Sequence, residues 1–171
     1  LTRNVVVTRY ENIPSEAIEI EKANVLDIIG CLVAGATAPG CSAVMKLVRE
    51  MGGKEESTIM MYGDRVPAEN AAFVNATMAR ALDFEACGGG ASHGSAPMVA
   101  TAFALSEKLD GVNGKDFLSA LVVGLDLITR ISSSYRMYDQ GWDPAILCSI
   151  FGTTAVAGKI LGLDEDQMLN S

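Results

Sequence analysis

The sequence predicts an all-α fold, and both its composition and its apolar pattern support this prediction. Of its 171 residues, 49% are hydrophobic but only 6% are aromatic. Such a composition favours closely packed helices over a sheet sandwich, which needs more aromatic and β-branched side chains. Apolar residues recur at helical spacing through six segments, whereas only one short run looks like a strand. A chain of this length fits a single domain with a sizeable core.

Six helices are expected along the chain, and several have recognisable start signals. Ser15 is the expected N-cap of the first helix, because serine side chains accept hydrogen bonds from free N–H groups at helix starts. Pro67 opens the third helix and Pro97 lies in the first turn of the fourth, where proline is well tolerated. The expected ranges are 15–35, 42–51, 68–83, 95–109, 115–133 and 144–161.

Three further segments refine this outline. Ser57 to Tyr62 is the strand-like run, and the Gly63-Asp64 turn after it allows at most one small β-hairpin. In the last long helix, Gly152, Ala155 and Gly158 would let another helix approach closely. Residues 163–171 look like a helix that has just begun, with acids in its first turn. We therefore expect this chain to be a piece of a longer polypeptide.

The bulk properties exclude several classes of protein. The net charge is −8 and there is no basic stripe, which argues against a nucleic-acid partner. The longest apolar run, 25–38, is too short to span a membrane, so no membrane partner is expected. The four cysteines lack CxxC spacing and there is one histidine, so no metal site is expected. Buried thiols and a reducing, cytoplasmic compartment are the expected consequence.

The segment 79–95 carries the residues best suited to chemistry. Asp83 ends an apolar helical pattern, and His93 follows ten positions later, just before the next expected helix. The run Gly88–Gly90 can aim backbone N–H groups inward, and a helix start adds more of them, which suits a carboxylate or phosphate. A carboxylate and an imidazole so placed are candidates for acid/base work. The alternative is a surface loop with a solvated histidine and a solvated acid.

Other charged residues have simpler interpretations. Arg80 and Glu85 are interpreted as partners of neighbouring charges, and Asp126 with Arg130 as a structural ion pair one helical turn apart. Arg136, in the aromatic loop after residue 133, is suited to bidentate binding of a carboxylate. It is equally well explained as an exposed loop residue.

In combination, three features of the chain resemble the MmgE/PrpD family, which includes 2-methylcitrate dehydratase, cis-aconitate decarboxylase and iminodisuccinate epimerase. They are the run 70–85, the histidine ten residues after Asp83, and the run 151–164. The resemblance covers nearly the whole chain. It implies that residues 1–171 are the N-terminal part of a helical domain, with a lid domain absent here. It also implies a homodimer and chemistry without a metal or organic cofactor.

The resemblance also implies roles for particular residues. Asp83 matches the first acid of the family's Asp-Phe-Asp-Asp-type motif, and His93 matches the histidine after it. Glu85 stands where a second acid is usual, and Cys87 where some members carry a hydroxyl residue. Near the start of the last long helix, members often carry a second histidine, where this chain has Asp143. The catalytic residues expected on this basis are Asp83, His93 and Asp143.

The resulting hypothesis is a lyase that acts on a small di- or tricarboxylate. Such a reaction needs a proton carrier beside the reacting carbon, for which His93 is suited, and donors for the carboxylates. The expected substrate-binding residues are Cys87, Gly89, Gly90 and Arg136. Dehydration is expected, with decarboxylation and epimerisation as alternatives. The rival is a non-catalytic helical dimerisation module or a degenerate family member, and the two hypotheses differ in whether Asp83 and His93 face one cavity.

Overall fold

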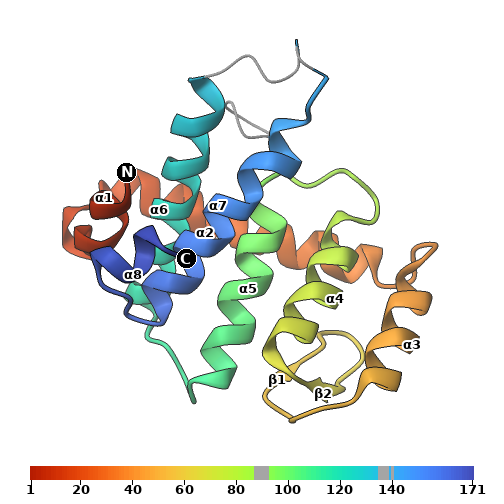
Figure 1. Ribbon diagram of the computed structural model, residues 1–171. Coiled ribbons are helices and arrows are strands. Elements are labelled where there is room, and N and C mark those ends of the chain that lie inside the picture. Colours follow the sequence, from red (N-terminus) through yellow and green to blue (C-terminus); the bar gives the residue numbers. More distant parts are fainter. Residues whose placement is uncertain (87–92, 135–138, 140) are drawn as a thin grey trace.

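The computed structural model describes residues 1–86, 93–134, 139 and 141–171 (Figure 1). Its described part contains eight α-helices, one 3-10 turn and two very short strands. The all-α prediction is confirmed, because 69% of the structure is helical. The helices are α1 (Thr2–Val7), α2 (Ser15–Gly35), α3 (Cys41–Met51), α4 (Ala68–Arg80), α5 (Ser95–Lys108), α6 (Gly114–Ser133), α7 (Pro144–Ile160) and α8 (Glu165–Leu169).

The helices pack around α5, which lies between α4 and α7 (Figure 1). On the other side of α7 lies α6, and the long helix α2 passes behind α4 and α5. The short helices α1 and α8 pack against each other at the edge where both termini lie. No helix among the described residues is long and apolar enough to cross a membrane.

The main apolar core joins α2, α3, α4, α5, α6 and α7, and a smaller apolar cluster joins α1 and α8 to α6 and α7. Glycines allow the backbones to approach closely. A Cβ at Gly35 would lie 1.9 Å from the carbonyl oxygen of Met78, so α2 lies directly against α4. A Cβ at Gly152 would lie 2.6 Å from Cγ2 of Ile128, which confirms the predicted close approach to α7. The core therefore fixes the relative positions of the helices that surround residues 80–95.

Three of the eight described α-helices, α6, α7 and α8, begin with a side-chain cap, whereas α1, α2, α3, α4 and α5 begin without one. The side chains of Asn113, Asp143 and Asp164 each accept a hydrogen bond from a free N–H group at the start of α6, α7 and α8. The prediction for Ser15 is wrong, because Ser15 is already the first helical residue and Pro14 occupies the cap position. Pro14 has the extended backbone that a cap requires, so the helix begins without a side-chain cap.

The predicted hairpin is confirmed in its smallest form. Strand β1 (Ser57–Thr58) pairs antiparallel with β2 (Arg65–Val66), with Ser57 opposite Val66. The N-terminal helix α1 and the 3-10 turn η1 (Tyr10–Asn12) were not expected from the apolar pattern. Both are too short to show a helical period, and tertiary packing stabilises α1 through the buried side chain of Val5.

The end of α4 differs from its prediction and matters for the site. The expected helix 68–83 ends at Arg80, and the chain turns there, with the N–H of Asp83 donating to the carbonyl of Arg80 at 3.1 Å. Asp83 has a left-handed backbone with φ of +55°. Its carboxylate is therefore presented from a turn beyond the helix rather than from the helix itself.

Candidate active site

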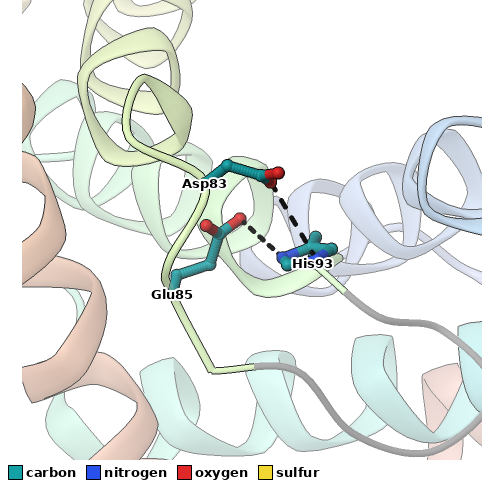
Figure 2. A group of neighbouring side chains, drawn as sticks. All are labelled: Asp83, Glu85 and His93. Atoms are coloured by element: carbon teal, nitrogen blue, oxygen red, sulfur yellow. Dashed lines mark ion pairs between the residues drawn. The ribbon is translucent and has the colours of Figure 1, made fainter. Parts of the chain in front are cut away.

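The candidate site is built by the connection between α4 and α5. Arg80 is the last residue of α4, Asp83 and Glu85 lie in the turn that follows, and His93 lies two residues before Ser95, where α5 begins. The prediction that His93 precedes a helix start is confirmed. Figure 2 shows the carboxylates of Asp83 and Glu85 both directed toward the imidazole of His93.

The two carboxylates face different nitrogens of the imidazole. Oε1 of Glu85 lies 3.4 Å from Nδ1 of His93, and Oδ1 of Asp83 lies 4.0 Å from Nε2 (Figure 2). The structure thus brings Asp83 and His93 together, as expected from the sequence. It also places a second acid, Glu85, nearer to the histidine than Asp83.

The two acids differ in how far they are buried. Residue Glu85 is 2% exposed, whereas the side chain of Asp83 is 69% exposed. Oε2 of Glu85 and Nδ1 of His93 are buried without a hydrogen-bond partner among the described residues. Buried polar atoms in folded proteins are nearly always paired, so such atoms call for an explanation, and a bound ligand or water is the usual one. Among the described residues, the Glu85–His93 pair therefore has unused hydrogen-bonding capacity.

Arg80 supplies the positive charge of the cluster. Its Nη1 lies 2.5 Å from Oε1 of Glu85 and 3.0 Å from Oδ1 of Asp83. Burial tends to lower the pKa of the guanidinium, but the hydrogen bond to Glu85 and the two carboxylate charges outweigh it and raise the pKa. Arg80 is therefore a permanent cation beside both acids.

Both Asp83 and His93 have a backbone conformation that non-glycine residues rarely adopt. Their φ angles are +55° and +65°, in the left-handed region. This conformation costs of the order of 1 kcal/mol for an ordinary residue, and such residues gather at functional sites where surrounding contacts hold them. The backbone conformations of Asp83 and His93 therefore need contacts with the rest of the fold to hold them.

A groove of about 490 Å³ opens beside the cluster. Arg80 and His93 lie on its wall, together with mostly apolar side chains of α4, α5 and α7. Its other lining residues are Phe73, Ala76, Thr77, Ala81, Pro97, Ala145, Ile146 and Ser149. Asp83 does not line the groove itself, although its carboxylate lies beside the imidazole that does. A small ligand in this groove would meet the imidazole of His93 and the guanidinium of Arg80.

The same cluster is the one place among the described residues where three potential metal ligands converge. Ligand atoms of Asp83, Glu85 and His93 all lie within 4.8 Å of one another. The guanidinium of Arg80, however, already lies between the two carboxylates and neutralises part of their charge. The donor set is thus shared with a protein cation, which weakens its attraction for a metal ion.

The remaining predicted residues are placed differently. Asp143 caps α7, and its Oδ1 accepts from the N–H of Ala145 at 2.8 Å. Ala145 lines the groove, whereas Asp143 is neither among the residues that line it nor part of the Asp83–Glu85–His93 cluster. The predicted substrate-binding residues lie outside the described residues and remain predictions: Cys87, Gly89, Gly90 and Arg136.

Arg80 and Glu85 are the site residues that the sequence analysis did not single out. Both residues are partners of neighbouring charges, as expected, but these neighbours are the site residues themselves. A usable signal was present for Glu85, which stands at the second acid of the family motif. Arg80 had no comparable signal beyond its place one turn before Asp83.

Comparison with known proteins gives the chain its context. A family model described as the MmgE/PrpD N-terminal domain matches residues 1–171. The cis-aconitate decarboxylase-like protein oryM of Aspergillus oryzae is 26% identical over 95% of this chain and 36% of its own length. Cis-aconitate decarboxylase of Aspergillus terreus is 26% identical over 92% of this chain and 34% of its own length. The 2-methylcitrate dehydratase of Cupriavidus necator is 27% identical over 96% of this chain and 36% of its own length. The chain thus spans about a third of these relatives' length.

Proposed function

The chain belongs to the MmgE/PrpD family, and we propose that it supplies the proton-transfer groups of a lyase that acts on a small di- or tricarboxylate. One observation carries the proposal: the imidazole of His93 lies between a buried carboxylate and an exposed one, on the wall of a groove that also contains a guanidinium. The names of the relatives support the same class, since they are a dehydratase and several decarboxylases. The active protein would include the segments of the family that lie outside this chain.

Dehydration is the reaction we propose first. Neutral His93 would take a proton through Nε2 from the carbon beside a substrate carboxylate. The electron pair of that C–H bond forms the new C=C bond, and hydroxide leaves from the neighbouring carbon. A second acid must give this hydroxide a proton to form water, and protonated Asp143, at the start of α7, is proposed for that role. Proton and charge then balance, with one water and one unsaturated acid as products.

The other residues of the cluster would tune this chemistry. Glu85 faces Nδ1 of His93, so it would hold the Nδ1–H tautomer and leave Nε2 free as the base. Arg80 would stabilise the negative charge that develops on the substrate when the proton leaves. Asp83 would stabilise the imidazolium that forms. Substrate carboxylates would be held by the predicted residues Cys87, Gly89, Gly90 and Arg136.

Decarboxylation is the second candidate, because several relatives are named cis-aconitate decarboxylases. In that case the C–C bond to a carboxylate breaks, CO₂ leaves, and the electron pair remains on carbon. The imidazolium of His93 would then donate the proton that this carbon needs. The same residues serve both reactions, so the cluster does not distinguish them. Epimerisation would likewise begin with proton removal by His93.

The rival hypothesis of a non-catalytic helical module accounts less well for the cluster. A structural module has no need for a buried polar atom without a partner, and Oε2 of Glu85 is such an atom among the described residues. Asp83 and His93 also lie side by side, although only His93 lines the groove. The homodimer suggested by the family resemblance remains a prediction.

A substrate panel tests the proposal. The complete protein would be incubated with citrate, 2-methylcitrate and cis-aconitate, and the products followed by NMR. Loss of water supports the dehydratase, and release of CO₂ supports the decarboxylase. Turnover that persists in a His93→Ala variant would contradict the proposed role of His93. Absence of both turnover and binding across the panel would favour the non-catalytic module.

A further inference from the structure

We propose that α2 positions the histidine, because Asn24 and Asp27 hold the two ends of the segment that carries His93. This inference rests on the proposed function for its catalytic consequence, but not for its structural part. It assigns a role to polar residues of α2 that lie behind the site and line no part of its groove. They are positioning residues, which act through Ser95 and Ala86 rather than on a substrate.

The first contact holds the segment where it enters α5. The side-chain amide of Asn24 donates to Oγ of Ser95 at 3.0 Å and also to Oε1 of Glu21 at 3.2 Å. All three residues are buried, with Glu21 at 2% exposure and Ser95 at 7%. Ser95 lies only two positions after His93. A buried hydrogen bond so close to His93 restricts where its backbone can lie.

The second contact holds the other end of the segment. Oδ2 of Asp27 accepts a hydrogen bond from the backbone N–H of Ala86 at 2.8 Å. Ala86 is the residue after Glu85, so this bond restrains the carboxylate that faces Nδ1 of His93. Asn24 and Asp27 are three positions apart on one helix and therefore share a face. The same face of α2 thus contacts both ends of the connection between residues 86 and 95.

A third residue, Cys31, lies one helical turn after Asp27 on the same face of α2. Burial raises the pKa of the Cys31 thiol, and the negative charges of Asp27 and Glu85 raise it further. Sγ of Cys31 lies 4.0 Å from Oδ2 of Asp27. Asp27 therefore contacts both the thiol of Cys31 and the backbone of Ala86, the residue after Glu85.

The backbone explains why the segment needs such restraint. Asp83 and His93 both have left-handed backbones, which an unrestrained chain would leave for more favourable conformations. Displacement of the imidazole by about 1 Å is enough to reduce catalysis on the order of 100-fold. Hydrogen bonds at both ends of the segment would prevent that displacement.

The first experiment compares two serine variants of the same helix. Ser95→Ala removes the acceptor used by Asn24, whereas Ser106→Ala removes a hydroxyl that bonds only to a carbonyl of its own helix. The complete protein would be assayed for kcat and KM on its substrate. The histidine Cε1–H NMR signal would be assigned to His93 by its loss in His93→Gln. We expect Ser95→Ala to lower kcat by about 10- to 100-fold with little change in KM, and to shift the His93 signal.

A double-variant cycle and a conservative variant sharpen the test. Asn24→Ala should lower kcat like Ser95→Ala, and the double variant should be no worse than Asn24→Ala alone, because both remove one interaction. Asp27→Ala should lower kcat. Asp27→Asn retains an acceptor for the N–H of Ala86, so its kcat should be close to that of the wild type. Glu19→Gln, on the exposed face of α2, should leave kcat unchanged.

The outcomes separate this inference from the proposed function. If Ser95→Ala matches Ser106→Ala in both kcat and the His93 signal, the positioning role is overturned. Additive losses in the double variant, or no rescue by Asp27→Asn, would also count against it. If the wild type lacks activity on every acid tested, the proposed function fails. The His93 signal then still decides whether α2 positions the histidine.

Discussion

Substitution of Glu21 by glutamine should make the protein more stable at neutral and alkaline pH. Glu21 is 2% exposed and lies on α2 behind the candidate site. Burial raises the pKa of its carboxyl group to about 7, and the hydrogen bond from Asn24 lowers this pKa only in part. The glutamine side chain would retain an acceptor for that bond but carries no charge at any pH.

The sign and size of the effect follow from proton binding. Between pH 4.5 and 7 the folded protein holds a proton on Glu21 that the unfolded chain has lost. The free energy of unfolding therefore falls as the pH rises through this window and levels off above it. The rise in the pKa of Glu21 from 4.5 to about 7 corresponds to roughly 3 kcal/mol. For a protein of this size that is a difference in Tm of roughly 6–12 °C.

Thermal and urea unfolding of wild type and Glu21→Gln between pH 4.5 and 8.5 would measure this difference. We expect similar stability at pH 4.5 and a growing advantage of the variant up to about pH 7.5. Glu19→Gln on the same helix, where the acid is exposed and paired with Lys22, should leave the pH dependence unchanged. The reasoning is refuted if wild type and Glu21→Gln lose stability in parallel across the whole range.

Three further substitutions test other parts of the account. Glu85→Gln should lower kcat by about 100-fold or more, because it removes the charge beside Nδ1 of His93. The control Glu56→Gln, which disrupts paired charges far from His93, should change only Tm. Equal kcat values in the two variants would argue against a role for Glu85. Gly124→Ala should destabilise by about 1–3 kcal/mol, because its Cβ would lie 2.7 Å from a side chain of α7, while Gly30→Ala, with open space around it, should stabilise slightly in thermal unfolding. Asp143→Asn should preserve Tm, because asparagine caps helices as well as aspartate does. A loss of kcat in this variant would therefore indicate an acid/base role for Asp143. An unchanged kcat would indicate that Asp143 only caps α7.

The sequence predicted the helices well where local signals mark them. Pro67 directly precedes α4, Pro144 begins α7, and the Gly63-Asp64 turn lies between the two short strands, all as expected. The predicted end of α4 at residue 83 was wrong. The apolar pattern continues to Leu82, but the ion pairs of Arg80 with the acids that follow it favour a turn after Arg80. Leu82 is in fact exposed, so it does not contribute to the core.

The site was predictable only in part, for a related reason. Asp83 and His93 are close in sequence, and their convergence follows from a short connection between two packed helices. The importance of Glu85 depends on its burial, and the residue after it, Ala86, bonds to Asp27 of α2, almost 60 residues earlier in the chain. No local pattern contains that information. The positive φ angles of Asp83 and His93 could not be predicted from the sequence either, because neither residue type requires them.

Solvent deuterium exchange tests the central claim most directly. The complete protein, in D₂O with the acid that it turns over, would be compared with His93→Ala by proton NMR. If His93 moves the substrate proton, deuterium appears at the carbon beside the carboxylate with the wild type and not with the variant. Equal incorporation by both proteins would show that another group carries the proton, and would contradict the role assigned to His93.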